Sequence, residues 1–206
     1  MGISIHFRGS ISSLENIEQF QSELVAICEV MNWEYHLVNQ DQQQPFSAKL
    51  VHSELGKKIE GHIPLRGIII SIDPQNEDLR LLFTPEGKLS DFMLEMLKQD
   101  GTLDRSSDWV SVKTQAGAVS SHVAVVKLLR YLQQTFLPDL EVRDEGEYWE
   151  TGDIEKLMGH RGFLAGKIMQ LEHALSNVQF DQAPTTEEVL LKIEEVIQKM
   201  MSHRKR

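Results

Sequence analysis

The chain has 206 residues, of which 41% are hydrophobic and 25% are charged. This composition is that of an ordinary globular domain. It excludes a mostly disordered chain, a collagen-like fibre and a small disulfide-rich protein. Asp and Glu number 31 against 21 Lys and Arg, so the formal net charge is −10. Because an acidic surface repels phosphate backbones, we expect no nucleic-acid partner.

The single cysteine, Cys28, rules out a disulfide within one chain. It lies among apolar residues at helical spacing, so we expect a buried, unreactive thiol. The first ten residues include His6 and Arg8 and lack the apolar core of a signal peptide. No apolar run reaches the roughly 20 residues that span a bilayer. These features predict a cytoplasmic protein without a membrane partner.

The first half of the chain reads as strands around one long helix. Period-two alternation or short apolar runs predict strands at residues 3–8, 33–38, 47–53, 57–63, 65–72 and 79–83. Apolar residues at helical spacing predict a helix over 14–31, and Ser90 is the predicted cap of a shorter helix. The isoleucine run within 65–72 lacks alternation, which is typical of a central strand or one covered on both faces.

The second half repeats this order of elements and then becomes helical. A strand is predicted at 109–114, a helix from Val119 to Phe136 and a strand at 140–143. Two further helices are predicted, one from Asp153 to about residue 178 and one from Pro184 to about residue 201. We therefore expect three parts: an αβ half over 1–98, a second βαβ half over 109–152 that shares its sheet, and a C-terminal helical hairpin over 153–206.

The strand–helix–strand pattern of residues 3–38 recurs at 110–145. The two strands align at one constant offset and the helices between them align within one residue, although few residues are identical. Internal duplication explains this match. So does the general need of any crossover helix to return the length of a strand, which gives unrelated βαβ units the same spacing.

Alternation along these strands separates an apolar face from a polar face. The residues predicted to face the helices are Ile3, Ile5, Phe7, Trp33, Tyr35, Leu37, Val110, Val112, Leu140 and Val142. The residues predicted on the opposite face are Ser4, His6, Arg8, Glu34, His36, Ser111, Lys113, Gln115, Glu141, Arg143 and Glu145. Helices on one side of a sheet and polar side chains on the other predict a two-layer α+β fold with a mixed, antiparallel-rich sheet, two βαβ crossover units and a C-terminal helical hairpin.

The polar face supplies most of the candidate ligand-binding residues. These are His6, Arg8, Glu34, His36, Lys113, Gln115 and Arg143. Imidazoles and carboxylates on one surface can bind a metal or perform acid–base chemistry, so His6, His36 and His62 are weak metal candidates, with Glu34 beside them. A solvated face, or one covered by a partner, explains the same residues, since opposite charges on neighbouring strands satisfy one another. No motif specifies a cofactor.

A second candidate site is the start of the helix at Ser120 and His122. Backbone N–H groups there are suited to a small anion, although the position of Ser120 favours a role as the helix cap. The last predicted helix carries an apolar stripe that packs either on its own chain or on a second copy in a homodimer. The leading hypothesis is a non-enzymatic binding or regulatory module. The alternatives are a metal-dependent or acid–base enzyme using the polar face, and a small-anion sensor using the helix start.

Overall fold

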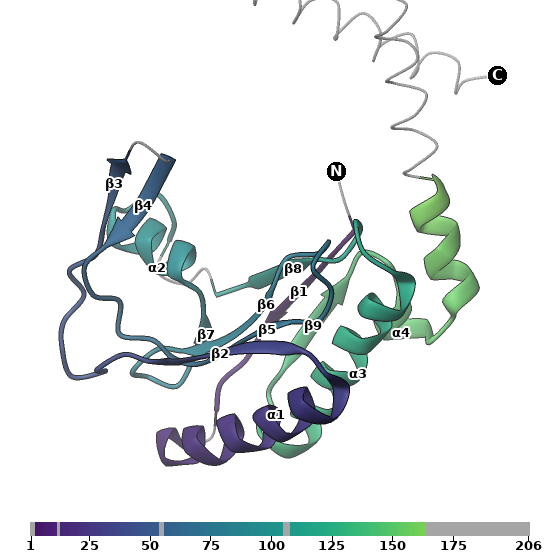
Figure 1. Cartoon of the computed structure of the whole chain (residues 1–206), viewed down its shortest axis with the longest axis horizontal. Coiled ribbons are helices and arrows are strands. Elements are labelled where there is room, and N and C mark those ends of the chain that lie inside the picture. The colour runs from purple at the N-terminus through teal and green to yellow at the C-terminus, as the bar shows by residue number, and fades with distance from the viewer. Residues whose placement is uncertain (1–2, 12, 54–55, 105–107, 164–206) are drawn as a thin grey trace, which may run out of the picture. The chain divides into compact units, whose positions relative to one another are not determined.

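The computed structural model describes residues 3–11, 13–53, 56–104 and 108–163 (Figure 1). Residues 2–157 form one compact unit, and a second unit begins at Met158, of which residues 158–163 are described and helical. The rest of the expected hairpin, residues 164–206, lies outside the described residues. No helix among the described residues is long and apolar enough to cross a membrane.

The first sheet has the strand order β8-β1-β9. Its strands are β1 (Ser4–Arg8), β8 (Val110–Lys113) and β9 (Glu141–Asp144). Both outer strands are antiparallel to β1, so β8 and β9 run parallel to each other, with helix α3 (Val119–Thr135) as their crossover. The second predicted βαβ unit is therefore present, and β1 is inserted between its two strands.

The second sheet has the strand order β2-β5-β6-β7 and is entirely antiparallel. Its strands are β2 (Glu34–Asn39), β5 (Arg66–Ser71), β6 (Leu79–Phe83) and β7 (Leu89–Ser90). A separate hairpin pairs β3 (Lys49–Ser53) with β4 (Gly56–Glu60). The interior position of β5 confirms the interpretation of the isoleucine run as a central strand. The fold is α+β, with antiparallel sheets.

Local signals start and end the helices. A 3-10 turn, η1 (Leu14–Asn16), leads into α1 (Ile17–Met31), which ends at Asn32 in the left-handed conformation (φ 54°) that asparagine tolerates. Helix α2 (Phe92–Gln99) begins at Asp91, whose carboxylate accepts the Leu94 N–H at 2.7 Å. The predicted cap, Ser90, instead donates its hydroxyl to Glu95. The short helix α4 (Tyr148–Thr151) follows β9.

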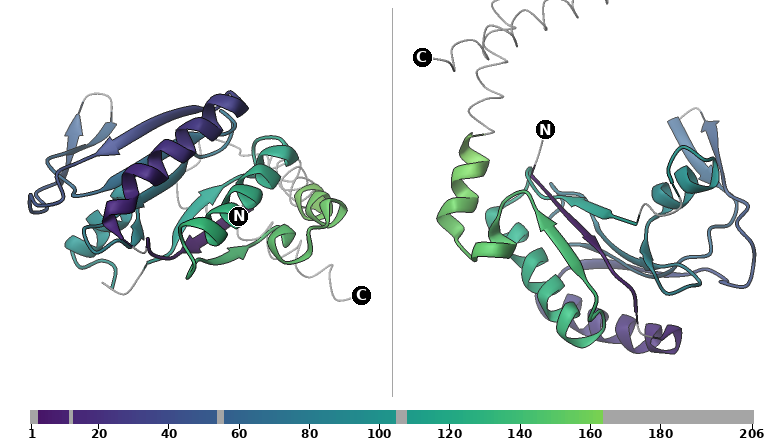
Figure 2. Two further views of the ribbon diagram at one scale, coloured as in Figure 1. Left: turned by 90° about the horizontal axis from the view of Figure 1, so that it is seen from below. Right: turned by 180° about the vertical axis from the view of Figure 1, so that it is seen from behind.

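Helices α1 and α3 lie side by side on the same side of both sheets (Figure 2). A single apolar cluster fills the space between helices and strands, and it includes Ile5 and Phe7 from β1 together with Val112 from β8. The sheets are joined where Leu89 N–H donates to Gly9 O (2.9 Å) and Glu77 N–H donates to Lys113 O (3.1 Å). The two expected αβ halves thus share one core, while their division at residues 99–108 stays a prediction.

A second apolar cluster covers the opposite face of the four-stranded sheet. Its buried members are Val38, Ile63, Leu65 and Leu82. Phe92 and Met96 of α2 and Ile59 of β4 pack against it. The expectation of a polar face is therefore wrong for this sheet, because apolar side chains of α2 and β4 pack on it. Figure 1 shows α2 and the β3–β4 hairpin on this side of the sheet. The expectation holds for the three-stranded sheet.

Strand β2 departs from the predicted burial. Tyr35 and Leu37 pair with the buried residues Ile70 and Ile68, so they lie on the helix side as predicted. They are nevertheless 40% and 38% exposed, because β2 is at the edge of its sheet and has no neighbouring strand on one side among the described residues. The first predicted crossover also joins strands of different sheets, β1 and β2, unlike the second. Internal duplication stays a prediction.

We expect Phe20→Ala to lower the free energy of unfolding by about 3–5 kcal/mol, the usual cost of removing a buried phenyl ring. Phe20 is fully buried in α1 and makes edge-to-face contacts with Phe83 (5.1 Å between ring centroids) and Phe136 (5.4 Å). Urea denaturation followed by circular dichroism measures the loss. Gln19→Ala, at an exposed position of the same helix, should change stability by less than about 0.5 kcal/mol. Equal losses would contradict the assignment of Phe20 to the core.

Candidate functional site

The register of the three-stranded sheet brings several predicted site residues together on its outer face. His6 of β1 lies opposite Arg143 of β9, Arg8 lies opposite Glu141, and Lys113 of β8 lies opposite Ser4. Apolar residues between them, such as Ile5 and Val112, point into the core. Alternation along paired strands thus gathers the basic side chains on the side away from the helices.

Trp109, immediately before β8, is the aromatic centre of this face. The guanidinium carbon of Arg143 lies 4.3 Å from its ring centroid, and that of Arg8 lies 4.8 Å away. Both distances fit cation–π contacts. Trp109 is not among the site residues predicted from the sequence, although its parity with Ser111 and Lys113 places it on the polar face. Alternation alone could have found it.

The two arginines have different electrostatic surroundings. Nη2 of Arg8 donates to both carboxylate oxygens of Glu141 (2.8 and 2.9 Å), and Nη1 donates to Asp108 (3.3 Å). These hydrogen bonds, that to Glu141 first, raise the pKa of the Arg8 guanidinium. Arg143 contacts Trp109 but forms no ion pair with any described carboxylate, and the same is true of the Lys113 ammonium group. Arg8 is thus neutralised, whereas Arg143 and Lys113 carry uncompensated charge.

Two other candidates on this side contact the main chain or a carboxylate. The Nε2 atom of His6 lies 3.7 Å from Glu145, whose other carboxylate oxygen accepts the Ser4 N–H at 2.8 Å. Oε1 of Gln115 accepts the Ile3 N–H at 3.2 Å. These contacts hold the edge of the face in place.

The remaining polar-face candidates lie elsewhere. Glu34 and His36 are exposed on β2, which belongs to the other sheet. His62, after β4, is buried, and its Nε2 lies 2.7 Å from the carbonyl oxygen of Asp41. The three histidines proposed as weak metal ligands are therefore on three different segments. Within the described ranges no group of three or more His, Cys, Asp or Glu could hold a metal ion.

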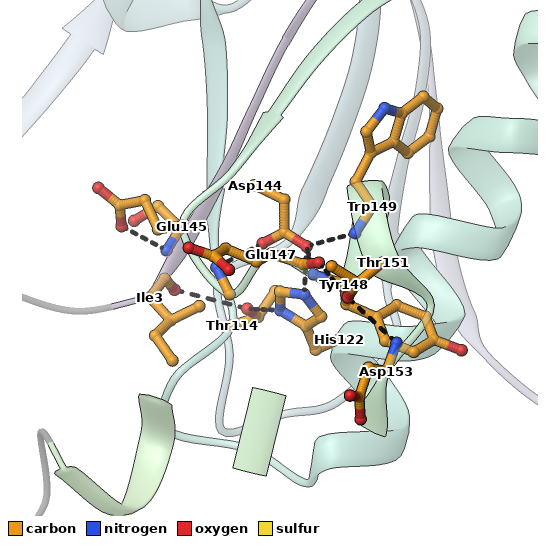
Figure 3. Close-up of polar contacts among 12 residues, drawn as sticks. Ile3, Thr114, His122, Asp144, Glu145, Glu147, Tyr148, Trp149, Thr151 and Asp153 are labelled. Carbon is orange, nitrogen blue, oxygen red and sulfur yellow. Dashed lines mark hydrogen bonds and ion pairs between the residues drawn. The ribbon is translucent and has the colours of Figure 1, made fainter. Parts of the chain in front are cut away.

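A separate, buried cluster joins a hydroxyl, an imidazole and a carboxylate (Figure 3). His122, in the first turn of α3, lies with Nδ1 2.7 Å from Oγ1 of Thr114 and with Nε2 3.0 Å from Oδ2 of Asp144. Thr114 follows β8, and Asp144 ends β9. The cluster therefore connects both strands of the βαβ unit to its crossover helix.

Asp144 is held by several donors besides His122. Its Oδ1 accepts the Gly146 N–H (2.7 Å), and its Oδ2 accepts the N–H groups of Tyr148 and Trp149 (2.9 Å each) at the start of α4. Burial alone raises the pKa of Asp144. The hydrogen bond and charge of His122, together with the backbone N–H groups, lower this pKa by more than burial raises it, so the net shift is downward. The carboxylate is therefore ionised at neutral pH, and the His122 Nε2–H donates to it.

This cluster resembles a catalytic triad in residue types but has no access to solvent. The side chains of His122 and Asp144 are both 0% exposed, and Thr114 is fully buried. A nucleophile or base must touch its substrate, so we assign the cluster a structural role. It satisfies buried polar groups and ties β8, α3, β9 and α4 to one another.

The start of α3 is also occupied by groups of the chain itself. The N-cap residue is Ala118, and its N–H donates to Asp73 at 2.8 Å. The Gly117 N–H donates to Oδ1 of Asn76 at 2.7 Å. The predicted cap Ser120 is exposed and does not cap the helix. The predicted anion site here is therefore filled at these two amides by the loop between β5 and β6.

Comparison with protein-family models, curated proteins and solved structures found no match to this chain.

We expect His122→Ala to lower the free energy of unfolding by about 2–4 kcal/mol, because it leaves a cavity and removes a buried partner of an ionised carboxylate. Guanidinium denaturation measures the loss. Lys127→Ala, at an exposed position of the same helix, is the matched control and should be nearly neutral. Equal stability of the two variants would show that the buried cluster contributes little.

We expect Asp144→Asn to flatten the acid dependence of stability. A carboxyl group with a folded-state pKa below its unfolded value of about 3.9 stabilises the fold above that value. Its contribution is lost as pH falls through the folded-state pKa. Wild type should therefore lose more stability than Asp144→Asn between pH 5 and about pH 2. The exposed control Glu155→Gln should keep the wild-type slope, and parallel curves for wild type and Asp144→Asn would refute the assignment.

Proposed function

We propose that this protein is a non-enzymatic binding module that holds a small anionic ligand on the outer face of the β8-β1-β9 sheet. The observation that carries the proposal is the position of Arg143. Its guanidinium lies against Trp109 and forms no ion pair with a described carboxylate. A guanidinium presents parallel N–H donors that match a carboxylate or phosphate, and stacking on a tryptophan restrains it before the ligand arrives.

The surroundings of Arg143 support an anion over a cation or an apolar ligand. Of the acidic residues on this face, Glu141 and Asp108 are already paired with Arg8. Glu145 lies beside His6 and accepts the Ser4 N–H. Lys113 adds a second positive charge on the same face, at the end of β8. The total charge of −10 disfavours long polyanions, so the proposed ligand is a small molecule.

The enzyme alternative lacks an observation in its favour. Its proposed groups His6, His36 and His62 are on separate segments, and the buried imidazole of His122 cannot reach a substrate. On the outer face, His6 beside Glu145 is the remaining imidazole–carboxylate pair among the described residues. Turnover of a phosphate ester or carboxylic ester that requires His6 would favour the enzyme.

The proposal also includes a cytoplasmic location and a homodimeric state. A chain with a single cysteine forms no disulfide within itself, which suits a reducing compartment. Burial raises the pKa of the Cys28 thiol to about 11 and leaves little reactive thiolate. The apolar stripe of the last predicted helix, which first suggested a dimer, lies outside the described residues. The oligomeric state is therefore a separate question from ligand binding.

Thermal unfolding with inorganic phosphate, pyrophosphate and citrate tests the binding proposal. A ligand at 100 times its dissociation constant adds about 2.7 kcal/mol of stability, and we expect at least one of these anions to stabilise wild type. Arg143→Ala should bind that anion at least tenfold more weakly and therefore show a smaller thermal shift. Arg130→Ala removes an arginine–tryptophan contact away from this face, at Trp149, and should leave binding unchanged. The proposal fails if none of the anions stabilises wild type or if Arg143→Ala binds as wild type does.

A further inference from the structure

Strand β2 is an exposed edge that carries apolar side chains. It lies at the end of the β2-β5-β6-β7 order, and five of its six residues are exposed. Tyr35 and Leu37 lie on the helix side of the sheet, opposite Ile70 and Ile68. The preceding helix α1 packs against β2 and ends in Val30 and Met31, which are 85% and 51% exposed. The edge therefore combines an open strand with an apolar surface.

Every second residue of β2 directs its backbone N–H and C=O groups away from β5. Gln40 N–H donates to Leu65 O at 3.2 Å, and these two residues continue the β2–β5 register. Hydrogen-bonded and non-hydrogen-bonded pairs alternate along an antiparallel ladder. The N–H and C=O groups of Val38, His36 and Glu34 therefore point to β5. Those of Tyr35, Leu37 and Asn39 point away from the sheet, where another strand can bind them.

Edge strands of monomers are usually blocked by lysine, proline or a covering element. The sequence of β2, Glu-Tyr-His-Leu-Val-Asn, contains no lysine, arginine or proline. A six-residue strand of this composition is long enough to pair with another chain. Such pairing would satisfy main-chain groups and cover apolar side chains in one step.

We propose that β2 pairs antiparallel with β2 of a second copy of this chain, with His36 on the two-fold axis. A two-fold contact uses the same surface on both copies, so β2 must be complementary to a second β2 that runs in the opposite direction. With His36 on the axis, Tyr35 of each copy lies opposite Leu37 of the other. Their outward main-chain groups then form hydrogen-bonded pairs. This inference specifies the surface of the proposed homodimer.

Side chains favour this register over the neighbouring one. On the helix side, Tyr35 and Leu37 of both copies form one apolar group at a distance that stabilises cross-strand pairs. On the other side, Glu34 lies opposite Val38 of the second copy and diagonally across from His36, which brings an acid near a base. Placing Leu37 on the axis would instead set Tyr35 opposite Asn39. The pairing of apolar with apolar and acid with base is what commits the edge to a second copy of itself.

Light scattering after size-exclusion chromatography tests the pairing on the full chain. We expect wild type at twice the mass of one chain, and Leu37→Lys as a monomer with an unchanged circular dichroism spectrum. Leu50→Lys is the matched control, since Leu50 is 41% exposed on β3, away from this edge. It should remain dimeric. A monomeric wild type, or a dimeric Leu37→Lys, would overturn the proposal.

Disulfide formation at the axis gives an independent test that does not depend on disrupting the strand. In the proposed register two His36→Cys side chains face each other as a non-hydrogen-bonded pair, with their Cβ atoms about 4.5–5.5 Å apart. Oxidised glutathione should therefore join the two cysteines in a disulfide and give a covalent dimer. Glu34→Cys, on the same face of the same strand, places its two sulfurs well apart and should not cross-link. The native Cys28 is buried and should not compete.

Absence of the His36→Cys cross-link, or an equal cross-link through Glu34→Cys, would overturn the register and with it the β2 dimer. The anion measurements can be repeated on monomeric Leu37→Lys, whose change is on the other sheet from Arg143. If the anion still binds to monomeric Leu37→Lys, anion binding does not depend on the dimer. Failure of the dimer proposal can therefore be told apart from failure of the anion proposal.

Discussion

The position of β1 between β8 and β9 is the constraint on which the proposed binding face depends. A central strand is paired along both edges, so its side chains can point only into the core or away from it. Ile5 and Phe7 enter the core shared with α1 and α3, and His6 and Arg8 are directed outward. The neighbouring strands repeat this division in register. The basic residues on the outer face therefore come together because the apolar residues between them are buried.

The contrast between Asp144 and Arg143 shows how burial decides whether a charged side chain needs a partner. Asp144 and His122 lie inside the fold, where each must be fully hydrogen-bonded because water cannot solvate it. Four donors satisfy Asp144 and leave no capacity for chemistry. Arg143 is in contact with solvent, which permits a guanidinium without an acidic partner. The group that remains available for a ligand is the solvated one.

The four-stranded sheet differs from the three-stranded one because apolar side chains pack on both of its faces. Phe92 and Met96 of α2 cover the face opposite the helices, so the sheet is apolar on both sides. Tyr35 and Leu37 keep the side of the sheet that their alternation predicts, but no described strand or helix covers them. An apolar residue on an edge strand is half-buried in one chain. Pairing of that edge with a further strand would bury it more fully.

The alternation and spacing of the sequence determined the strands, the two long helices, their common side of the sheet and the outward direction of His6, Arg8, Lys113 and Arg143. These features follow from local periodicity, which every segment carries within itself. The tertiary structure alone decided that β1 separates β8 from β9, that α2 covers the second sheet, and that His122 meets Asp144 inside the fold. Those contacts join segments far apart in the chain, and their energy depends on packing partners that no single segment encodes.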